Sequence, residues 1–325
     1  MLDRVALVRL LLIVNPKASS VTPRRRIAVE RTLRDADLGV AHDLDVVETT
    51  ARGDARALTE RAATEGVDVI VILAGDGTLN EAANGLAAGP TALAALPGGS
   101  TNVLARTLGI AYNPADAAEQ LVRSLKAKSF RRVGLGAASP PGVDARRFLF
   151  HLGVGFDAAV ISRMERRPSV KRYAAHLAFA TIAVGTWLRH FERSLDIRLE
   201  IAGPRDDTAA LVGVGPYAVI SNSDPYTYVG RRRVTLAPDA GFDRRLAATV
   251  FTNLHASLLL RSAASGATRA RFVTRSAAII QRGDVDRLTV SGHRPFPWQV
   301  DGDFMGEVER LDVVYEPDAL TLVVP

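Results

Sequence analysis

Short apolar runs alternate with amphipathic segments along the chain as far as Arg132. The apolar runs have the length of strands and lie at Leu10–Val14, Leu44–Val47, Val67–Leu73 and Ala92–Leu96. The segments between and after them, at 24–36, 54–64, 80–86, 102–108 and 114–125, have the composition of helices. Because strands and helices alternate, the pattern predicts a parallel sheet with helices on both faces, a Rossmann-like α/β layout.

The pattern changes after Arg132. Short strand-like runs at 148–150, 195–199, 218–220, 234–236, 247–250 and 287–290 are separated by Gly, Pro, Asn and Asp turns, and one helix is expected at 170–191. This pattern of short strands and turns predicts a mainly antiparallel β domain. A chain of 325 residues is long enough for two domains. We therefore expect an α/β domain over 1–132 and a β-rich domain over 133–315, with the active site in the cleft between them.

The composition is that of an ordinary globular protein, with 47% apolar and 23% charged residues. The absence of cysteine excludes disulfides, thiolate metal sites and thiol nucleophiles. A net charge of +6 favours anionic partners. The apolar N-terminal residues are interrupted by Arg9 and lack a cleavage site, so they are interpreted as a first strand and not a targeting segment.

The longest apolar stretch, Tyr173–Leu188, is too short to span a membrane. Two interpretations stay open for it, a buried helix and an interfacial helix. The second interpretation draws on the basic residues just before the stretch, which suit an anionic bilayer surface. These are Arg163, Arg166, Arg167, Lys171 and Arg172.

The segment Ala74–Glu81, with the sequence AGDGTLNE, carries the clearest chemistry. It follows a buried strand and leads into a helix, and two glycines flank Asp76. Such a turn lets the backbone approach a phosphate, and the N–H groups that open the helix can bind its oxygens. Asp76 would repel a phosphate, so we expect it to hold a metal ion or a water molecule. A Gly-Asp-Gly turn alone is common and often binds nothing, whereas the full run predicts a nucleoside triphosphate with Mg²⁺.

Two further loops lie at equivalent places. Asn15 and Gly98 each follow a predicted strand, as Gly75 does. The carboxyl ends of parallel strands meet at one edge of the sheet, where such folds bind ligands. The three loops are therefore expected to converge.

Near the C-terminus, Asp301-Gly302-Asp303 places two acids around a glycine. A carboxylate there can accept the proton of an acceptor hydroxyl, and Asp301 and Asp303 are the expected acid/base unit. A β-turn with two solvated acids is the plain alternative.

Five segments in order, at 14–19, 74–81, 96–106, 153–158 and 300–303, resemble the diacylglycerol-kinase-type catalytic domain of bacterial lipid kinases. Sphingosine and ceramide kinases share this domain, and NAD kinase and 6-phosphofructokinase are distant relatives. The resemblance covers nearly the whole chain. It implies a β-sandwich in the second domain and a final segment, 316–325, that returns to the first.

The resemblance also implies roles for particular residues. Thr50 resembles an ATP contact, with a helix cap as the alternative. The expected metal ligands are Asp76, Asp157 and Asp243, and Asp76 also joins the two acids near the C-terminus in catalysis. The remaining expected ATP contacts are Asn15, Pro16, Lys17, Ala18, Ser19, Ala74, Gly75, Asp76, Gly77, Thr78, Leu79, Asn80, Glu81, Ser100, Thr101 and Asn102.

The chain departs from the family pattern at three places. Asp303 stands where the family usually has Glu, which leaves open whether Asp301 or Asp303 is the base. Val103 stands where the family often has Asp. Arg244 and Arg245 replace the second Asp and the Gly of a stretch that binds a structural magnesium in some members. Arginine cannot ligate a cation, so that site is expected to be absent or altered, with Asp243 as its remnant.

The resemblance thus implies an ATP- and Mg²⁺-dependent lipid kinase with diacylglycerol as the favoured acceptor and phosphatidic acid as the product. It implies a cytoplasmic protein of lipid metabolism that docks on the anionic inner membrane face. An NAD kinase-like enzyme and a non-catalytic nucleotide- or lipid-binding protein are the alternatives. No nucleic-acid motif accompanies the basic charge. The oligomeric state is not readable from the sequence, and a homodimer stays open.

Overall fold

The computed structural model describes residues 7–86, 89–165, 196–201, 210–255, 257–258, 261 and 272–325. The helix expected at 170–191, including the apolar stretch Tyr173–Leu188, lies outside the described residues. The chain forms two compact units, Met1–Val133 with Asp318–Pro325 and Gly134–Pro317. We call them unit 1 and unit 2. Within the described residues, no helix combines the length and the apolar character that a membrane crossing requires.

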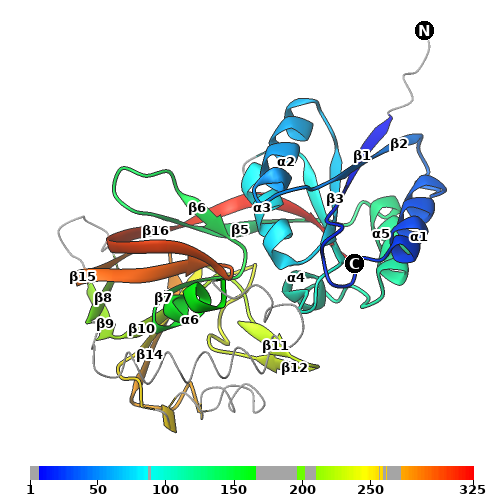
Figure 1. Cartoon of the computed structure of the whole chain (residues 1–325). Coiled ribbons are helices and arrows are strands. Elements are labelled where there is room, and N and C mark those ends of the chain that lie inside the picture. The colour runs from blue at the N-terminus through cyan, green and yellow to red at the C-terminus, as the bar shows by residue number, and fades with distance from the viewer. Residues whose placement is uncertain are drawn as a thin grey trace. The chain divides into compact units, whose positions relative to one another are not determined.

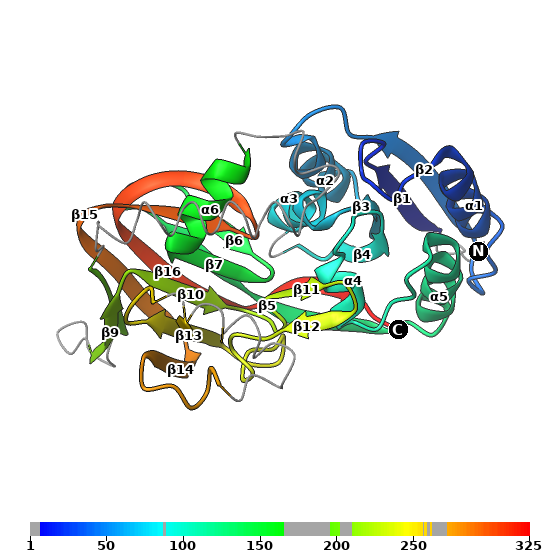
Figure 2. The same ribbon diagram turned by 60° about the horizontal axis from the view of Figure 1, so that its bottom comes forward.

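Unit 1 contains a parallel sheet in the order β2-β1-β3-β4, and the end of β16 adds to β4, also in parallel. Figures 1 and 2 show helices on both faces, α1 and α5 on one and α2 and α3 on the other. The elements are β1 (Val8–Val14), α1 (Pro23–Arg34), β2 (His42–Glu48), α2 (Asp54–Thr64), β3 (Val69–Ala74), α3 (Asp76–Leu86), β4 (Ala92–Pro97), α4 (Val103–Thr107) and α5 (Pro114–Lys126).

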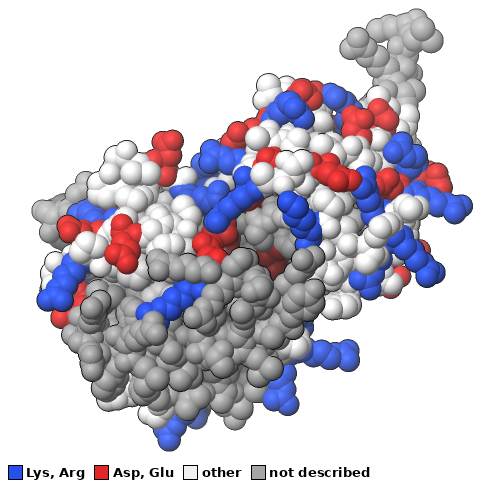
Figure 3. Space-filling view, in the orientation of Figure 1, with Lys and Arg blue, Asp and Glu red and all other residues white. Residues whose placement is uncertain are grey.

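The sequence accounts for this arrangement locally. Every residue of β3 and of β4 is buried, as expected of central strands covered on both faces. Helix α1 starts where the hydroxyl of Thr22 accepts the N–H of Arg25 (3.3 Å), and α5 starts at the corresponding cap Asn113. On the face drawn in Figure 3, basic and acidic side chains of unit 1 are interspersed.

Unit 2 is mainly antiparallel, with the strand order β14-β13-β10-β7-β15-β16. Strands β5 and β16 begin in one unit and end in the other. The elements are β5 (Phe130–Ser139), β6 (Arg146–Phe148), β7 (His151–Gly155), α6 (Phe156–Glu165), β8 (Ile197–Ile201), β9 (Ala210–Gly215), β10 (Tyr217–Ser221), β11 (Thr227–Val229), β12 (Arg232–Val234), β13 (Leu246–Phe251), β14 (Ile279–Val285), β15 (Arg287–Val300) and β16 (Asp303–Val323).

Strand β15 divides the sheet of unit 2 into two layers. Its first half pairs with β8 and its second half with β7, and the pairing register shifts between Ser291 and Phe296. Leu199 from β8 and Val250 from β13 belong to one buried core. The sheet therefore folds over its own apolar side chains. The expected fold class, a parallel α/β domain with an antiparallel β domain, is confirmed.

Local expectations differ from the structure at several places, one of which is the strand expected at 234–236, because β12 ends at Val234. The strand expected at 148–150 is wrong, because residues 149 and 150 are the bend between β6 and β7. Helix α3 begins at Asp76, four residues before the expected start. Strand β16 is a single 21-residue strand, of which the sequence indicated only the last residues.

Candidate functional site

The loops that follow the parallel strands of unit 1 are joined by hydrogen bonds at one edge of the sheet. The amide nitrogen of Asn15 donates to the hydroxyl oxygen of Thr78 at 3.0 Å. The N–H of Ser20 donates to the carbonyl of Gly98 (2.8 Å), and its hydroxyl to the carbonyl of Gly99 (3.1 Å). The expected convergence is therefore present. Ser20, which joins the loops after β1 and β4, has a role that the sequence did not indicate.

Two of the glycines at this edge, Gly98 and Gly99, are needed for backbone packing. A Cβ on Gly98 would lie 2.7 Å from the nitrogen and Cα of Ala74. A Cβ on Gly99 would lie 2.8 Å from the Cα of Gly75, and one on Gly75 would lie 3.4 Å from the Cα of Gly99. The loops after β3 and β4 thus touch through their main chains. This packing role of Gly98 and Gly99 was not indicated by the sequence.

Gly77 differs from Gly98 and Gly99. A Cβ at this position would meet no atom within 4 Å, and the residue is exposed. It lies in the first turn of α3, where the backbone N–H groups have no partner within the helix. A helix N-terminus with open space above it fits a phosphate group, because the N–H groups and the helix dipole both favour an anion.

Asp76 opens α3 and faces the start of α4. Its Oδ1 accepts the N–H of Leu104 at 3.4 Å. Burial raises the pKa of Asp76, while the N–H groups of residues 102–104 and Arg106 act in the opposite direction. A single carboxylate beside a phosphate cradle fits Mg²⁺, which in proteins is often held by one or two carboxylates together with substrate phosphates and water.

Several expected ATP contacts support the loops from inside. Leu79 and Asn80 are buried, and the main-chain carbonyl of Asn80 accepts the side-chain amide of Asn84 (2.9 Å). Ala74 is buried at the end of β3. The side chain of Asn102 accepts the N–H of Gly99 and donates to its carbonyl, both at 2.8 Å. These residues shape the edge, whereas Pro16, Lys17, Ser19 and Ser100 are exposed on it, and Ala18, Glu81 and Thr101 are half-buried.

Thr50 is bound into the loop after β2. Its N–H and hydroxyl both donate to Oδ2 of Asp54 at 2.7 Å, and its carbonyl accepts the ammonium group of Lys17 at 3.0 Å. The N-cap of α2 is Gly53, so Thr50 is not the helix cap of the alternative interpretation. Its role as an ATP contact stays a prediction.

In unit 2, the two acids near the C-terminus occupy the turn between β15 and β16. Asp301 and Gly302 both have positive φ, +48° and +87°. The carboxylate of Asp301 accepts three backbone N–H groups, from Leu149 at 2.7 Å and from Phe150 and His151 at 2.9 Å. Asp301 therefore fixes the bend between β6 and β7 while it occupies a left-handed turn.

Burial raises the pKa of Asp301 to about 7, the nearby charge of Asp303 acts in the same direction, and the three N–H groups oppose both. Asp303 is less enclosed, and its Oδ2 lies 3.8 Å from a guanidinium nitrogen of Arg146. A carboxylate that titrates near neutral pH has the proton affinity of an effective general base.

The other two expected metal ligands lie in different surroundings. Asp157 is buried, and its oxygens accept the hydroxyl of Tyr226 (2.5 Å) and the amide of Gln299 (2.7 Å). Asp243 is exposed. In the part of the chain that the structure describes, no three His, Asp or Glu side chains are grouped so that they could hold a metal ion. The metal roles of Asp157 and Asp243 thus stay predictions from the resemblance.

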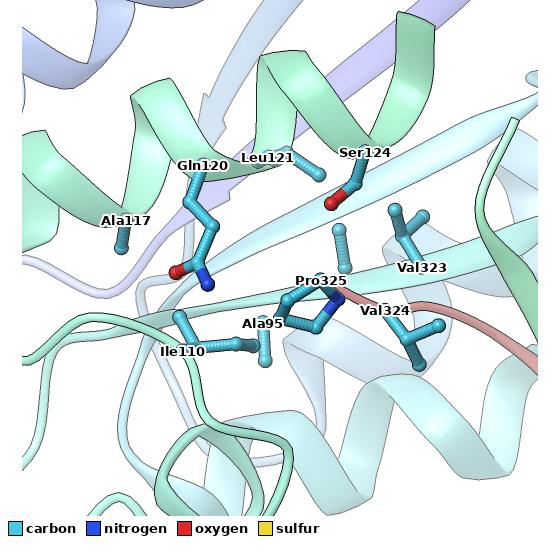
Figure 4. Close-up of a pocket in the computed structure, with 10 residues that line it drawn as sticks. Ala95, Ile110, Ala117, Gln120, Leu121, Ser124, Val323, Val324 and Pro325 are labelled. Atoms are coloured by element: carbon cyan, nitrogen blue, oxygen red, sulfur yellow. The ribbon is translucent and has the colours of Figure 1, made fainter. Parts of the chain in front are cut away.

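Unit 1 also contains a small pocket beside the C-terminus (Figure 4). None of the residues around it belongs to the converging loops. They are contributed by β4, the loop between α4 and α5, α5 and the chain end, and most are apolar: Ala94, Ala95, Ile110, Ala117, Gln120, Leu121, Ser124, Val323, Val324 and Pro325. Gln120 is already engaged there, because its side chain bonds the backbone of Gly109 and Ala111.

Residues 9–131 match the family model of the diacylglycerol kinase catalytic domain. The chain is 33% identical over 153 residues to a Pseudomonas aeruginosa (strain UCBPP-PA14) protein named "Probable lipid kinase YegS-like", a match that covers 46% of this chain and 45% of that protein. It is 48% identical over 65 residues to a diacylglycerol kinase of Bacillus subtilis, over 19% of this chain and 21% of the relative. Each of these two matches thus spans less than half of the relative.

Solved structures extend the similarity to the whole fold. A crystal structure of a diacylglycerol kinase from Bacillus anthracis superimposes with a TM-score of 0.66 at 18% identity, over 98% of this chain and 97% of the other. At this identity the match shows a shared fold.

Proposed function

We propose that this chain, whose residues 9–131 match the family model of the diacylglycerol kinase catalytic domain, is an ATP-dependent lipid kinase that phosphorylates a lipid hydroxyl. Diacylglycerol is the proposed acceptor and phosphatidic acid the product. The observation that carries the proposal is the first turn of α3, whose Gly77 has open space around it at the edge where the loops of unit 1 meet.

In this proposal, unit 1 holds the nucleotide. The first-turn N–H groups of α3 bind phosphate oxygens, and the hydroxyl of Thr78 is held in place by Asn15. Asp76 would hold Mg²⁺, which neutralises charge on the transferred phosphoryl group. Phosphoryl transfer depends mainly on positioning and electrostatic stabilisation, so a cradle of N–H groups with one carboxylate is a suitable donor site.

Unit 2 supplies the proton acceptor. We assign this role to Asp301, because its pKa of about 7 makes it both ionised and basic at neutral pH. Its carboxylate accepts the proton of the lipid hydroxyl as the oxygen attacks the terminal phosphorus of ATP, and ADP leaves. Asp303, paired with Arg146, contributes negative charge that raises the proton affinity of Asp301.

We further propose that the protein meets its substrate at an anionic membrane surface from the cytoplasmic side. The hairpin β11–β12 supports this proposal, because Arg231, Arg232 and Arg233 are exposed on it. Anionic headgroups attract such basic segments. The rate of phosphate transfer should therefore be higher with vesicles that contain an anionic lipid than with vesicles that lack one.

The test is transfer of label from γ-labelled ATP to a panel of diacylglycerol, a sphingoid base and a polyprenol in mixed micelles, with NAD as a separate acceptor. Label in diacylglycerol supports the proposal, and label in another lipid changes the acceptor. Label in NAD alone would assign the chain to the NAD kinase-like alternative. Label in no acceptor would favour a non-catalytic binding protein.

A further inference from the structure

A ring of contacts, made by side chains and by the backbone N–H groups of His151 and Gly302, lies around the turn at Asp301. The N–H of His151 donates to Oδ1 of Asp301 at 2.9 Å. The ring of His151 packs on that of Tyr226, with centroids 4.2 Å apart. The hydroxyl of Tyr226 donates to Oδ1 of Asp157 at 2.5 Å. Asp301 is thus connected to Asp157 through two aromatic side chains.

The ring closes through Gln299. Its Nε2 donates to Oδ2 of Asp157 at 2.7 Å, and its Oε1 accepts the N–H of Gly302 at 2.7 Å. Gln299 is completely buried and Asp157 is 4% exposed. The series of contacts that begins at Asp301 and His151 therefore ends at Gly302, the next residue in the chain after Asp301.

The contact between Asp157 and Gln299 requires a glycine at position 153. A Cβ on Gly153 would lie 2.0 Å from Oδ2 of Asp157 and 2.6 Å from Nε2 of Gln299. The glycine before Val154 thus has a steric purpose, which is to let a carboxylate and an amide meet inside the sheet.

The polarity of the pair fixes the orientation of the amide. A carboxylate only accepts hydrogen bonds, so Asp157 requires the NH₂ group of Gln299. The carbonyl oxygen of Gln299 is then directed to the N–H of Gly302. A flipped amide would place donor against donor at Gly302 and acceptor against acceptor at Asp157, and it would leave buried polar groups without partners.

We propose that Asp157 and Gln299 are positioning residues for phosphoryl transfer, which hold Gly302 and thereby the directions of the carboxylates of Asp301 and Asp303. The inference rests on the proposed kinase function. It differs from the metal role that the resemblance implies for Asp157, because here its carboxylate serves as an acceptor for two neutral donors.

Three variants separate the two roles. In Asp157→Asn, the new amide oxygen still accepts from Gln299 and the new NH₂ group donates to the oxygen of Tyr226, so positioning survives. In Gln299→Glu, two carboxylates face each other and the turn is displaced. The double variant combines both changes. Its amide at position 157 donates to the carboxylate at position 299 and accepts from Tyr226. That carboxylate still accepts from Gly302, so the ring re-forms with one bond reversed.

The measurement is kcat and KM for ATP and for the accepted lipid at pH 8, together with the melting temperature. We expect Gln299→Glu to lower kcat by roughly 10–100-fold with KM for ATP unchanged, since small displacements of reacting groups have effects of this size. Asp157→Asn should lose less activity than Gln299→Glu, and the double variant should recover most of the activity that Gln299→Glu loses.

Loss of activity in Asp157→Asn without recovery in the double variant would overturn the proposal in favour of a required carboxylate. Wild-type kcat in Gln299→Glu, or a loss that only follows the melting temperature, would overturn it in favour of a purely structural network. An inactive wild type would refute the kinase function instead. The amide resonance of Gly302 then tests the ring alone, and it must shift in Gln299→Glu and return in the double variant.

Discussion

Gly98 packs directly against the main chain of Ala74, whereas Gly77, three residues after Ala74, has no neighbour where its side chain would be. The two glycines therefore have different roles at the same edge of the sheet, one in packing and the other in the proposed ligand binding. The first brings the loops after β3 and β4 together, and the second leaves open the first turn of α3.

Gly77→Ala should weaken ATP binding without a loss of stability, whereas Gly98→Ala should lower the stability of the fold. In Gly77→Ala the fold stays as stable or gains up to about 1 kcal/mol, because alanine is the better helix former, and KM for ATP rises at least about tenfold. In Gly98→Ala the forced contact with Ala74 lowers the free energy of unfolding by about 1–3 kcal/mol. Chemical denaturation and ATP kinetics check both. Unchanged ATP kinetics in Gly77→Ala would contradict the phosphate cradle.

Thr78→Val should weaken the nucleotide site, with Thr78→Ser as its matched control. Valine keeps the shape but removes the oxygen that accepts from Asn15 (3.0 Å), which leaves that amide without its partner. We expect KM for ATP to rise about tenfold and stability to fall by about 1 kcal/mol. Serine keeps the oxygen and should stay close to wild type. A loss in Thr78→Ser together with wild-type behaviour of Thr78→Val would show that the methyl group matters and not the hydrogen bond.

The rate should depend on pH through Asp301. Burial raises the pKa of this carboxyl to about 7, and only the ionised form accepts a proton. We therefore expect kcat/KM to fall about tenfold per pH unit below 7 and to be level above it. Asp303→Asn removes a neighbouring negative charge, so the midpoint should move to lower pH. A wild-type profile that is flat from pH 5 to 8 would rule out Asp301 as the base.

Removal of Mg²⁺ should stop catalysis without weakening the fold. Around Asp243, arginines pair with the nearby acids: Arg244 lies 3.6 Å from Asp239 and Arg245 lies 2.9 Å from Asp286. The arginines thus place positive charge beside the acids of the stretch that binds a structural magnesium in some members of the family. EDTA should abolish phosphate transfer and leave the melting temperature of the nucleotide-free protein unchanged. A lower melting temperature in EDTA would show that a structural ion is present.

The parts of the fold with strong sequence patterns were predictable. The continuous apolar runs of β3 and β4 reflect burial on both faces, and the order of the loops followed from the parallel sheet. The start of α3 at Asp76 was not predictable from propensity, because glycine is a poor helix former. The acidic side chain of Asp76 in the first turn favours a helix N-terminus at this point.

The ring of contacts around the turn at Asp301 was not predicted, because the residues that form it are far apart in the sequence. Gln299 and Asp157 are separated by 142 residues, and the partner of Tyr226 is Asp157 on another element. One signal was available. Gln299 is a polar residue between Trp298 and Val300, immediately before Asp301, and a buried amide in an apolar strand needs partners.

The most direct test of the account is the rate of phosphatidic acid formation from ATP and diacylglycerol in anionic vesicles, measured for wild type and for Asp301→Asn at matched melting temperatures. We predict product from the wild type and a rate at least about 100-fold lower from the variant, the size expected for the loss of a general base. Equal rates would contradict the assigned base, and no product from the wild type would contradict the proposed diacylglycerol kinase activity.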